Sequence, residues 1–170
     1  MCAALAALLL CSLTACGKTE EPARQDIFAM DTYMSLVAYG EDGQEALAAA
    51  AREINRLEQE LSRTVSTSYI YKLNENGSAA VSEETANLLK AAMDYSAATG
   101  GLFDMTVAPL VSLWGITTDS PRVPSRSEID ALLPLVGSGH VHLDGQTVTL
   151  DAGCAVDLGG IAKGYASDRV

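Results

Sequence analysis

Between residues 28 and 39 hydrophobic positions alternate with polar ones, and this spacing predicts a β-strand with Phe28, Met30, Met34 and Leu36 on one face. The stretch 40–43 is rich in glycine and acidic residues and predicts a turn. From Gln44 to Leu61 apolar residues recur at helical spacing, which predicts a long amphipathic helix packed on the sheet. Its expected inward positions are Leu47, Ala50, Ala51, Ile54, Leu57 and Leu61.

Three more elements follow from local signals. A second helix should begin at Ser82, whose hydroxyl can cap free backbone N–H groups, and end at the glycines 100 and 101, with Leu88, Leu89, Ala92, Met93 and Ala97 inward. A short helix is expected over Ser127–Leu133. A hairpin should follow, with Asp144-Gly145 as its turn and Val141, Leu143, Val148 and Leu150 as its apolar positions. The chain is therefore predicted to be an α+β protein, a mixed sheet with packed helices.

The first fifteen residues form a charge-free apolar run that is typical of a signal peptide. The run ends in Leu13-Thr14-Ala15-Cys16, which resembles the lipobox of bacterial lipoproteins, and we expect lipid on Cys16. We therefore predict a signal peptide over 1–15, a lipidated tether over 16–26 and a folded domain over 27–170. The protein would be anchored to the cell membrane and face the periplasm or extracytoplasmic space. An ordinary buried N-terminal helix is the alternative.

The formal net charge of -11 argues against a nucleic-acid partner, because binding phosphates of nucleic acids requires clustered lysine and arginine. An anionic ligand must therefore be held by local groups or by a metal ion. Cys154 lies in an apolar stretch and is expected to pack as a small apolar residue. His140 and His142 share one face of a predicted strand; a metal pair is conceivable there, but exposed strand residues are the preferred interpretation.

Four motifs stand in a fixed order along the chain. They are Met30-Asp31-Thr32, LSR at 61–63 with SYIYKLN at 68–74, GGLFDMTVAPL at 100–110 followed by LWG at 113–115, and DLGGIAKGYASD at 157–168. Together they resemble the ApbE family, whose members show MGT, LSR-x(4)-S-x-I-x-x-LN, GGxFDxTVxPLxxLWG and DLGGIAKGYAxD in the same order. The resemblance extends from Phe28 to the end of the chain.

The resemblance implies a magnesium-dependent FAD:protein FMN transferase, which moves FMN from FAD onto a threonine or serine of a partner flavoprotein and releases AMP. It also implies the site residues. The FAD site would be lined by Met30, Leu102, Phe103, Asp104, Asp157 and Lys163, with Asp157 and Lys163 catalytic, and the backbone oxygen of Gly160 would be one Mg²⁺ ligand.

The residues themselves support a nucleotide site at the last motif. Gly159 and Gly160, placed between an expected strand and an expected helix, let the backbone approach a pyrophosphate. Lys163, about one helical turn beyond Gly160, can present its ammonium group to phosphate oxygens. Glycines that serve close packing alone are the alternative. For Asp104 a helix cap competes with ligand contact, and for Phe103 and Trp114 core packing does.

Two substitutions and one absence depart from the family pattern. Asp31 replaces the usual glycine, and Thr64 stands where many members have tyrosine. Family members usually continue well beyond this length, with a carboxylate and a threonine that complete the magnesium site. We therefore expect a sequence truncated at its C-terminus, with the remaining ligands beyond Val170. The main rival function is a non-catalytic FAD-binding lipoprotein that holds or delivers flavin; a general solute-binding lipoprotein would leave the motifs unexplained.

Overall fold

The computed structural model describes residues 21–116 and 118–170. The predicted signal peptide and Cys16, the predicted site of lipidation, lie outside these residues. Along the described part no helix is both long and apolar enough to cross a membrane.

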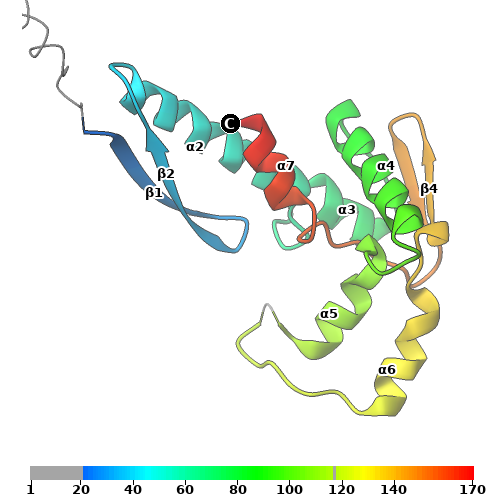
Figure 1. Cartoon of the computed structure of the whole chain (residues 1–170). Coiled ribbons are helices and arrows are strands. Elements are labelled where there is room, and N and C mark those ends of the chain that lie inside the picture. Colours follow the sequence, from blue (N-terminus) through cyan, green and yellow to red (C-terminus); the bar gives the residue numbers. More distant parts are fainter. Residues whose placement is uncertain (1–20, 117) are drawn as a thin grey trace, which may run out of the picture.

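The predicted α+β fold is confirmed (Figure 1). Its elements are β1 Ala23–Ala29, β2 Thr32–Ala38, α2 Gly43–Leu61, α3 Tyr69–Asn76, β3 Ser78–Ala80, α4 Glu83–Ala98, α5 Ala108–Trp114, α6 Arg126–Leu132, β4 Val141–Asp144, β5 Thr147–Leu150 and α7 Ala162–Arg169, with 3₁₀ turns at Met105–Val107, Leu133–Leu135 and Ser138–His140.

The predicted strand over 28–39 is in fact two strands. β1 and β2 pair antiparallel, with Ala29 opposite Thr32, and the connection is a two-residue turn at Met30 and Asp31. Both turn residues have positive φ, 52° and 54°, as the favoured hairpin turn requires. The turn reverses the chain, so Phe28 does not share a face with Met34 and Leu36; it is 71% exposed. β1 starts at Ala23, so residues 23–26 belong to a strand and not to a flexible tether.

The first long helix matches its prediction. α2 covers Gly43–Leu61 and buries Leu47, Ala51, Ile54, Leu57 and Leu61 as expected, whereas Ala50 is only half-buried. It lies along the β1–β2 hairpin (Figure 1). An isolated two-stranded hairpin is only marginally stable in water. Packing of its inner face against α2 therefore stabilises this sheet.

The second part of the fold combines α3, α4 and a three-stranded antiparallel sheet of order β3-β5-β4. α4 begins where predicted: the Ser82 hydroxyl accepts a hydrogen bond from the Thr85 N–H. Ser96 is buried where Ala97 was expected, and Ala97 is exposed. The β4–β5 turn is centred on residues 145 and 146, one position later than predicted, since Asp144 pairs with Thr147. α3 and β3 had no predicted counterpart.

One hydrophobic core joins these elements. Residues from α2, α3, α4, the strands β4 and β5, and α7 form one cluster, whose most buried members include Leu57, Ile70, Leu73, Leu89, Met105, Val148 and Val156. Cys154 belongs to it, as predicted from its apolar surroundings, and burial raises the pKa of its thiol. Such a thiol is a poor nucleophile because the thiolate is disfavoured.

The predicted short helix is present as α6, shifted by one residue, and begins with a capping box between Ser125 and Glu128. Hydrogen bonds from Arg122 first, and then from the Ser125 N–H and hydroxyl, lower the pKa of Glu128 to about 2. Because the folded state has the lower pKa, the stabilisation is complete above the ordinary value of 4.5 and is lost as pH falls toward 2.

We therefore expect Glu128→Gln to unfold at lower urea concentration than the parent near neutral pH, and this gap to narrow as pH falls below about 4.5. Urea titrations of both proteins at several pH values measure it. A gap that is the same at pH 3 as at pH 7 would contradict the role of the ionised carboxylate.

Candidate functional site

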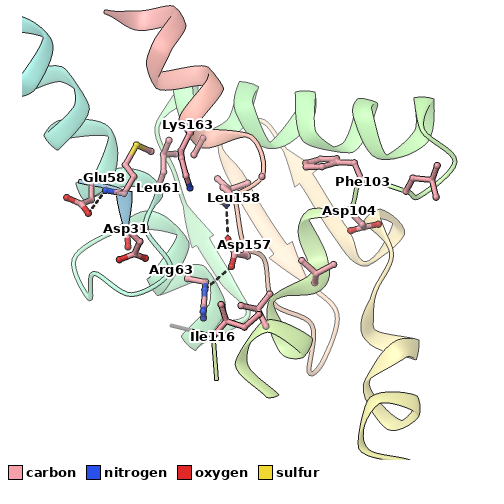
Figure 2. Close-up of a pocket in the computed structure, with 18 residues that line it drawn as sticks. Asp31, Glu58, Leu61, Arg63, Phe103, Asp104, Ile116, Asp157, Leu158 and Lys163 are labelled. Atoms are coloured by element: carbon pink, nitrogen blue, oxygen red, sulfur yellow. Dashed lines mark hydrogen bonds and ion pairs between the residues drawn. The ribbon is translucent and has the colours of Figure 1, made fainter. Parts of the chain in front are cut away.

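A cavity of about 550 Å³ lies where the hairpin turn, the end of α2 and the loops before α5 and α7 meet. Figure 2 shows the residues that face it. All seven residues that the sequence assigned to the FAD and metal sites line this cavity: Met30, Leu102, Phe103, Asp104, Asp157, Gly160 and Lys163. Segments that are separated by more than a hundred positions in the chain thus meet at one place.

The hairpin turn is fixed to α2 by one hydrogen bond. The backbone N–H of Met30 donates to Glu58 Oε1 at 2.9 Å, so the turn sits over the last two helical turns of α2. Both Glu58 and Asp31 line the cavity beside Met30. Nothing in the sequence pattern marked Glu58, because it stands among the polar residues of an amphipathic helix.

The segment that precedes the glycines is not a strand, contrary to the prediction. Instead, the side chain of Asn74 pairs with the backbone of Val156 as a neighbouring strand would: Nδ2 donates to the Val156 carbonyl at 2.9 Å, and Oδ1 accepts from its N–H at 2.8 Å. The next N–H, of Asp157, donates to the Met105 carbonyl at 2.7 Å. Hydrogen bonds from Asn74 on one side and to Met105 on the other thus hold the extended backbone at Val156 and Asp157 in place.

The carboxylate of Asp157 organises the loop. One oxygen accepts a hydrogen bond from the Gly159 N–H at 2.8 Å, and the other lies 2.8 Å from Nε of Arg63. Both side chains are mostly buried, with 20% and 16% of their area exposed. Asp157, predicted to be catalytic, therefore has a visible positioning role. Arg63 was part of a recognised motif without an assigned function, and it now belongs to the cavity wall.

The two glycines allow close packing against protein groups, which was the alternative interpretation of this motif. A Cβ on Gly160 would lie 3.0 Å from the ring of Phe103, and one on Gly159 would lie 3.0 Å from the Asp157 carboxylate. Phe103 itself packs edge-to-face with Tyr95, at a centroid distance of 6.5 Å. The ring therefore serves both the core and the cavity. Trp114, for which ligand contact was the other possibility, does not line this cavity.

Asp104 is a structural cap. One oxygen accepts from the N–H and hydroxyl of Thr106, at 2.8 and 2.6 Å, and the other from the Ser96 hydroxyl and the Ser138 N–H, at 3.1 and 3.0 Å. Four donors occupy this carboxylate, so the helix-cap alternative holds. Its neighbour Leu102 is 94% exposed at the rim of the cavity, where a ligand can cover it.

Lys163 lies in the first turn of α7 and its amine extends toward the cavity (Figure 2). In the described part of the chain it forms no salt bridge. The carboxylates Asp104, Asp157 and Glu58 around it already hold other groups. Its ammonium charge is thus available to an anion in the cavity.

The residues described here do not assemble a magnesium site by themselves. Across residues 21–116 and 118–170, no group of three or more histidine, cysteine, aspartate or glutamate side chains is arranged to hold a metal. Mg²⁺ prefers oxygen ligands in an octahedral arrangement. Three of the four carboxylates on the cavity wall bind protein donors, and the carbonyl of Gly160 alone is not a site.

The two histidines lie away from the cavity. His142 is in β4 and exposed, as predicted, whereas His140 is in the 3₁₀ turn before it and only partly exposed. Both rings hydrogen-bond to Asp151, at 2.9 and 2.8 Å, and these bonds, His140 first, lower the pKa of that carboxyl. A surface polar cluster explains the pair without a metal.

Comparison with known proteins gives this arrangement a family. The model of the ApbE family matches residues 30–170, which include the whole cavity wall. The chain belongs to the ApbE family. It is 33% identical to the FAD:protein FMN transferase of Vibrio cholerae over 98% of this chain and 52% of the relative, and 30% identical to that of Salmonella typhimurium over 100% and 53%.

Solved structures of ApbE proteins share the fold. The ApbE protein of Thermotoga maritima superposes with a TM-score of 0.83 at 36% identity, over 88% of this chain and 51% of that one. The flavin transferase ApbE of Vibrio cholerae superposes with a TM-score of 0.76 at 27% identity, over 88% and 52%. The chain spans about half the length of the relatives it matches.

Proposed function

We propose that the protein is a FAD:protein FMN transferase. The observation that carries the proposal is the cavity itself: the hairpin turn, the loop before α5 and the DLGG segment, three motifs far apart in sequence, line one space with Lys163 at its edge. The family relatives named FAD:protein FMN transferase support the same reaction. The substrates are FAD and a partner flavoprotein with an acceptor threonine or serine.

In this reaction the acceptor hydroxyl attacks the phosphorus of the FMN moiety, and the bond to AMP breaks. The transferred group carries charge on its oxygens, so catalysis depends on positioning and electrostatic stabilisation. Lys163 supplies positive charge beside the phosphates. The Asp157–Arg63 pair and the Asn74–Val156 bonds hold the glycine segment in the shape that lets the backbone approach them.

The proposal includes Mg²⁺ and a lipid anchor. A bound Mg²⁺ would neutralise charge on the pyrophosphate. The described residues do not form a complete Mg²⁺ site alone. The roles given above to Lys163, Asp157, Arg63 and Asn74 therefore do not depend on the metal ion. A lipid on Cys16, which lies outside the described residues, would keep the protein at the membrane on the extracytoplasmic side, near flavin-carrying subunits of membrane redox complexes.

The direct test uses the protein as its gene encodes it, purified and mixed with FAD, Mg²⁺ and a flavin-acceptor domain. We expect the acceptor to gain the mass of one FMN, as measured by mass spectrometry, and EDTA to abolish the gain. Tight FAD binding without a gain on any acceptor would instead favour the rival flavin-holding lipoprotein. No FAD binding at all would reject both functions.

Asp31 provides a separate prediction. It occupies the second turn position at φ 54°, where glycine is favoured, and it brings a negative charge to the cavity wall. We expect Asp31→Gly to stabilise the protein by about 0.5–1 kcal/mol and to bind FAD about two- to fivefold more tightly, because a like charge near the pyrophosphate is removed. Thermal unfolding and FAD titration measure the two effects.

Asp31→Asn separates the two causes, since asparagine tolerates positive φ but has no charge. It should reproduce the gain in FAD affinity with little gain in stability. If both variants bind FAD as the parent does, the charge of Asp31 does not reach the ligand.

A further inference from the structure

α7 carries Lys163 and follows the glycine segment, yet little apolar surface holds it. Its buried residues are Ala162 and Ala166, whose side chains are single methyl groups. A second cavity, of about 460 Å³, lies between α7 and α4 and is lined by Tyr165 on one side and Leu88 and Tyr95 on the other. Besides these two residues, the half-buried ring of Tyr165 packs against the core. Burial of apolar area is non-directional and does not by itself fix an orientation. Something else must set how this helix is rotated.

A polar network connects α7 with α4 and α2. The hydroxyl of Tyr165 donates to Glu84 Oε1 at 2.6 Å, and the other oxygen of Glu84 lies 2.8 Å from Nη2 of Arg56. Arg56 also pairs with Glu53 and Glu60, each at 2.7 Å. Arg169, at the end of α7, lies 3.4 Å from Glu84.

The protonation states of Glu84 and Tyr165 at neutral pH favour the hydrogen bond between them. The hydrogen bond from Tyr165, and next the contact with Arg56, lower the pKa of Glu84. Burial first, and then the bond to Glu84, raise the pKa of Tyr165 to about 12. At neutral pH an ionised carboxylate therefore faces a protonated phenol, and a hydrogen bond to a charged acceptor is among the stronger ones.

The hydrogen bond of Tyr165 also determines the direction in which Lys163 projects from α7, because both residues lie on the same helix. Residues 163 and 165 lie about 200° apart around the helix axis, at 3.6 residues per turn. When Tyr165 is held toward Glu84 of α4, Lys163 extends to the other side of α7. There it lines the cavity described above (Figure 2). Rotation of α7 would move the amine of Lys163 out of that cavity.

We propose that Tyr165, bonded to the Glu84–Arg56 network, is a positioning residue that sets the rotation of α7 and thereby aims Lys163 at the pyrophosphate of FAD. The inference rests on the proposed transferase function for its kinetic consequence. Its structural part, the anchoring of α7, stands apart from that function. Tyr165 contacts no substrate in this scheme and acts through Lys163.

A double-mutant cycle tests the kinetic part in the protein as its gene encodes it. We expect Tyr165→Phe to lower kcat/KM for FMN transfer by about five- to tenfold, since small displacements of a charged group are costly in phosphoryl transfer. In a Lys163→Ala background the same change should cost less than about twofold, because the residue it aims is absent. Glu84→Gln, whose amide oxygen can still accept a hydrogen bond from the phenol O–H, should retain more activity than Glu84→Leu.

Tyr69→Phe is the matched control, because Tyr69 also packs against the core but its hydroxyl has no hydrogen bond among the described residues. It should leave kcat/KM unchanged. Equal losses from Tyr165→Phe with and without Lys163 would overturn the proposal, because they would indicate general destabilisation.

Hydrogen exchange followed by mass spectrometry tests the anchor without catalysis. Tyr165→Phe should speed exchange in residues 158–169 and leave α2 and α3 unchanged. Unchanged exchange in 158–169 would overturn the anchoring. If the parent protein transfers no FMN, the proposed function fails, and this measurement still decides whether Tyr165 holds α7.

Discussion

Replacing Lys163 with alanine is expected to lower the rate of FMN transfer by about 100-fold, the usual cost of removing one preorganised group that stabilises transition-state charge. The amine faces the cavity and forms no salt bridge within the described residues, so its charge is available to an anionic ligand there, which under the proposed function is FAD (Figure 2). The side chain is exposed, and α7 buries other residues. The free energy of unfolding should therefore change little.

Two comparisons make this expectation specific. Lys72→Ala removes another exposed lysine, which lies in α3 and outside the cavity, and this variant should transfer FMN at the parent rate. Lys163→Arg keeps the positive charge and should recover part of the activity. Steady-state kinetics on an acceptor domain, with circular dichroism of each variant, provides the measurement. A Lys163→Ala protein with more than half the parent activity would remove this lysine from the mechanism.

The sequence was informative where a local signal has a single physical meaning. The helical stripe from Leu47 to Leu61, the Ser82 cap and the glycines at 100 and 101 predicted α2 and α4 to within a residue or two. The site residues came from motif resemblance, not from periodicity. Their meeting at one cavity could not follow from spacing, because it depends on how distant segments pack.

The failures have identifiable causes. The alternation of apolar residues continues through Met30 and Asp31, so the pattern hides a hairpin turn made without glycine or asparagine. The polar stretch before β3 contains α3, whose helical face is only a few residues long and whose Ser68 cap is buried. Asp104 and Asp157 resemble ligand-binding carboxylates in sequence, but their oxygens bind protein donors, which only three-dimensional contacts reveal.

Replacement of Asn74 is expected to have the second large effect, a loss of stability. The sequence shows only a polar residue near the end of α3. In the fold its side-chain amide hydrogen-bonds to both the N–H and the carbonyl of Val156, which is fully buried. Asn74→Ala would leave a buried N–H and a buried carbonyl without partners. Each such loss costs about 1–3 kcal/mol, so we expect the two together to destabilise the protein by about 2–6 kcal/mol.

The neighbouring Asn76 makes the comparison sharp, because it lies on the same helix and its amide donates to the exposed backbone carbonyl of Lys72. Asn76→Ala should change the free energy of unfolding by less than about 0.5 kcal/mol. Asn74→Asp retains the acceptor for the Val156 N–H but places a second oxygen against the Val156 carbonyl, so it should be nearly as harmful as alanine. Urea unfolding of the three variants measures the differences.

Since Val156 directly precedes Asp157, both Asn74 variants should also weaken FAD binding at temperatures where they remain folded. Stable Asn74 variants that bind FAD normally would show that Met105 and Arg63 suffice to hold the glycine segment.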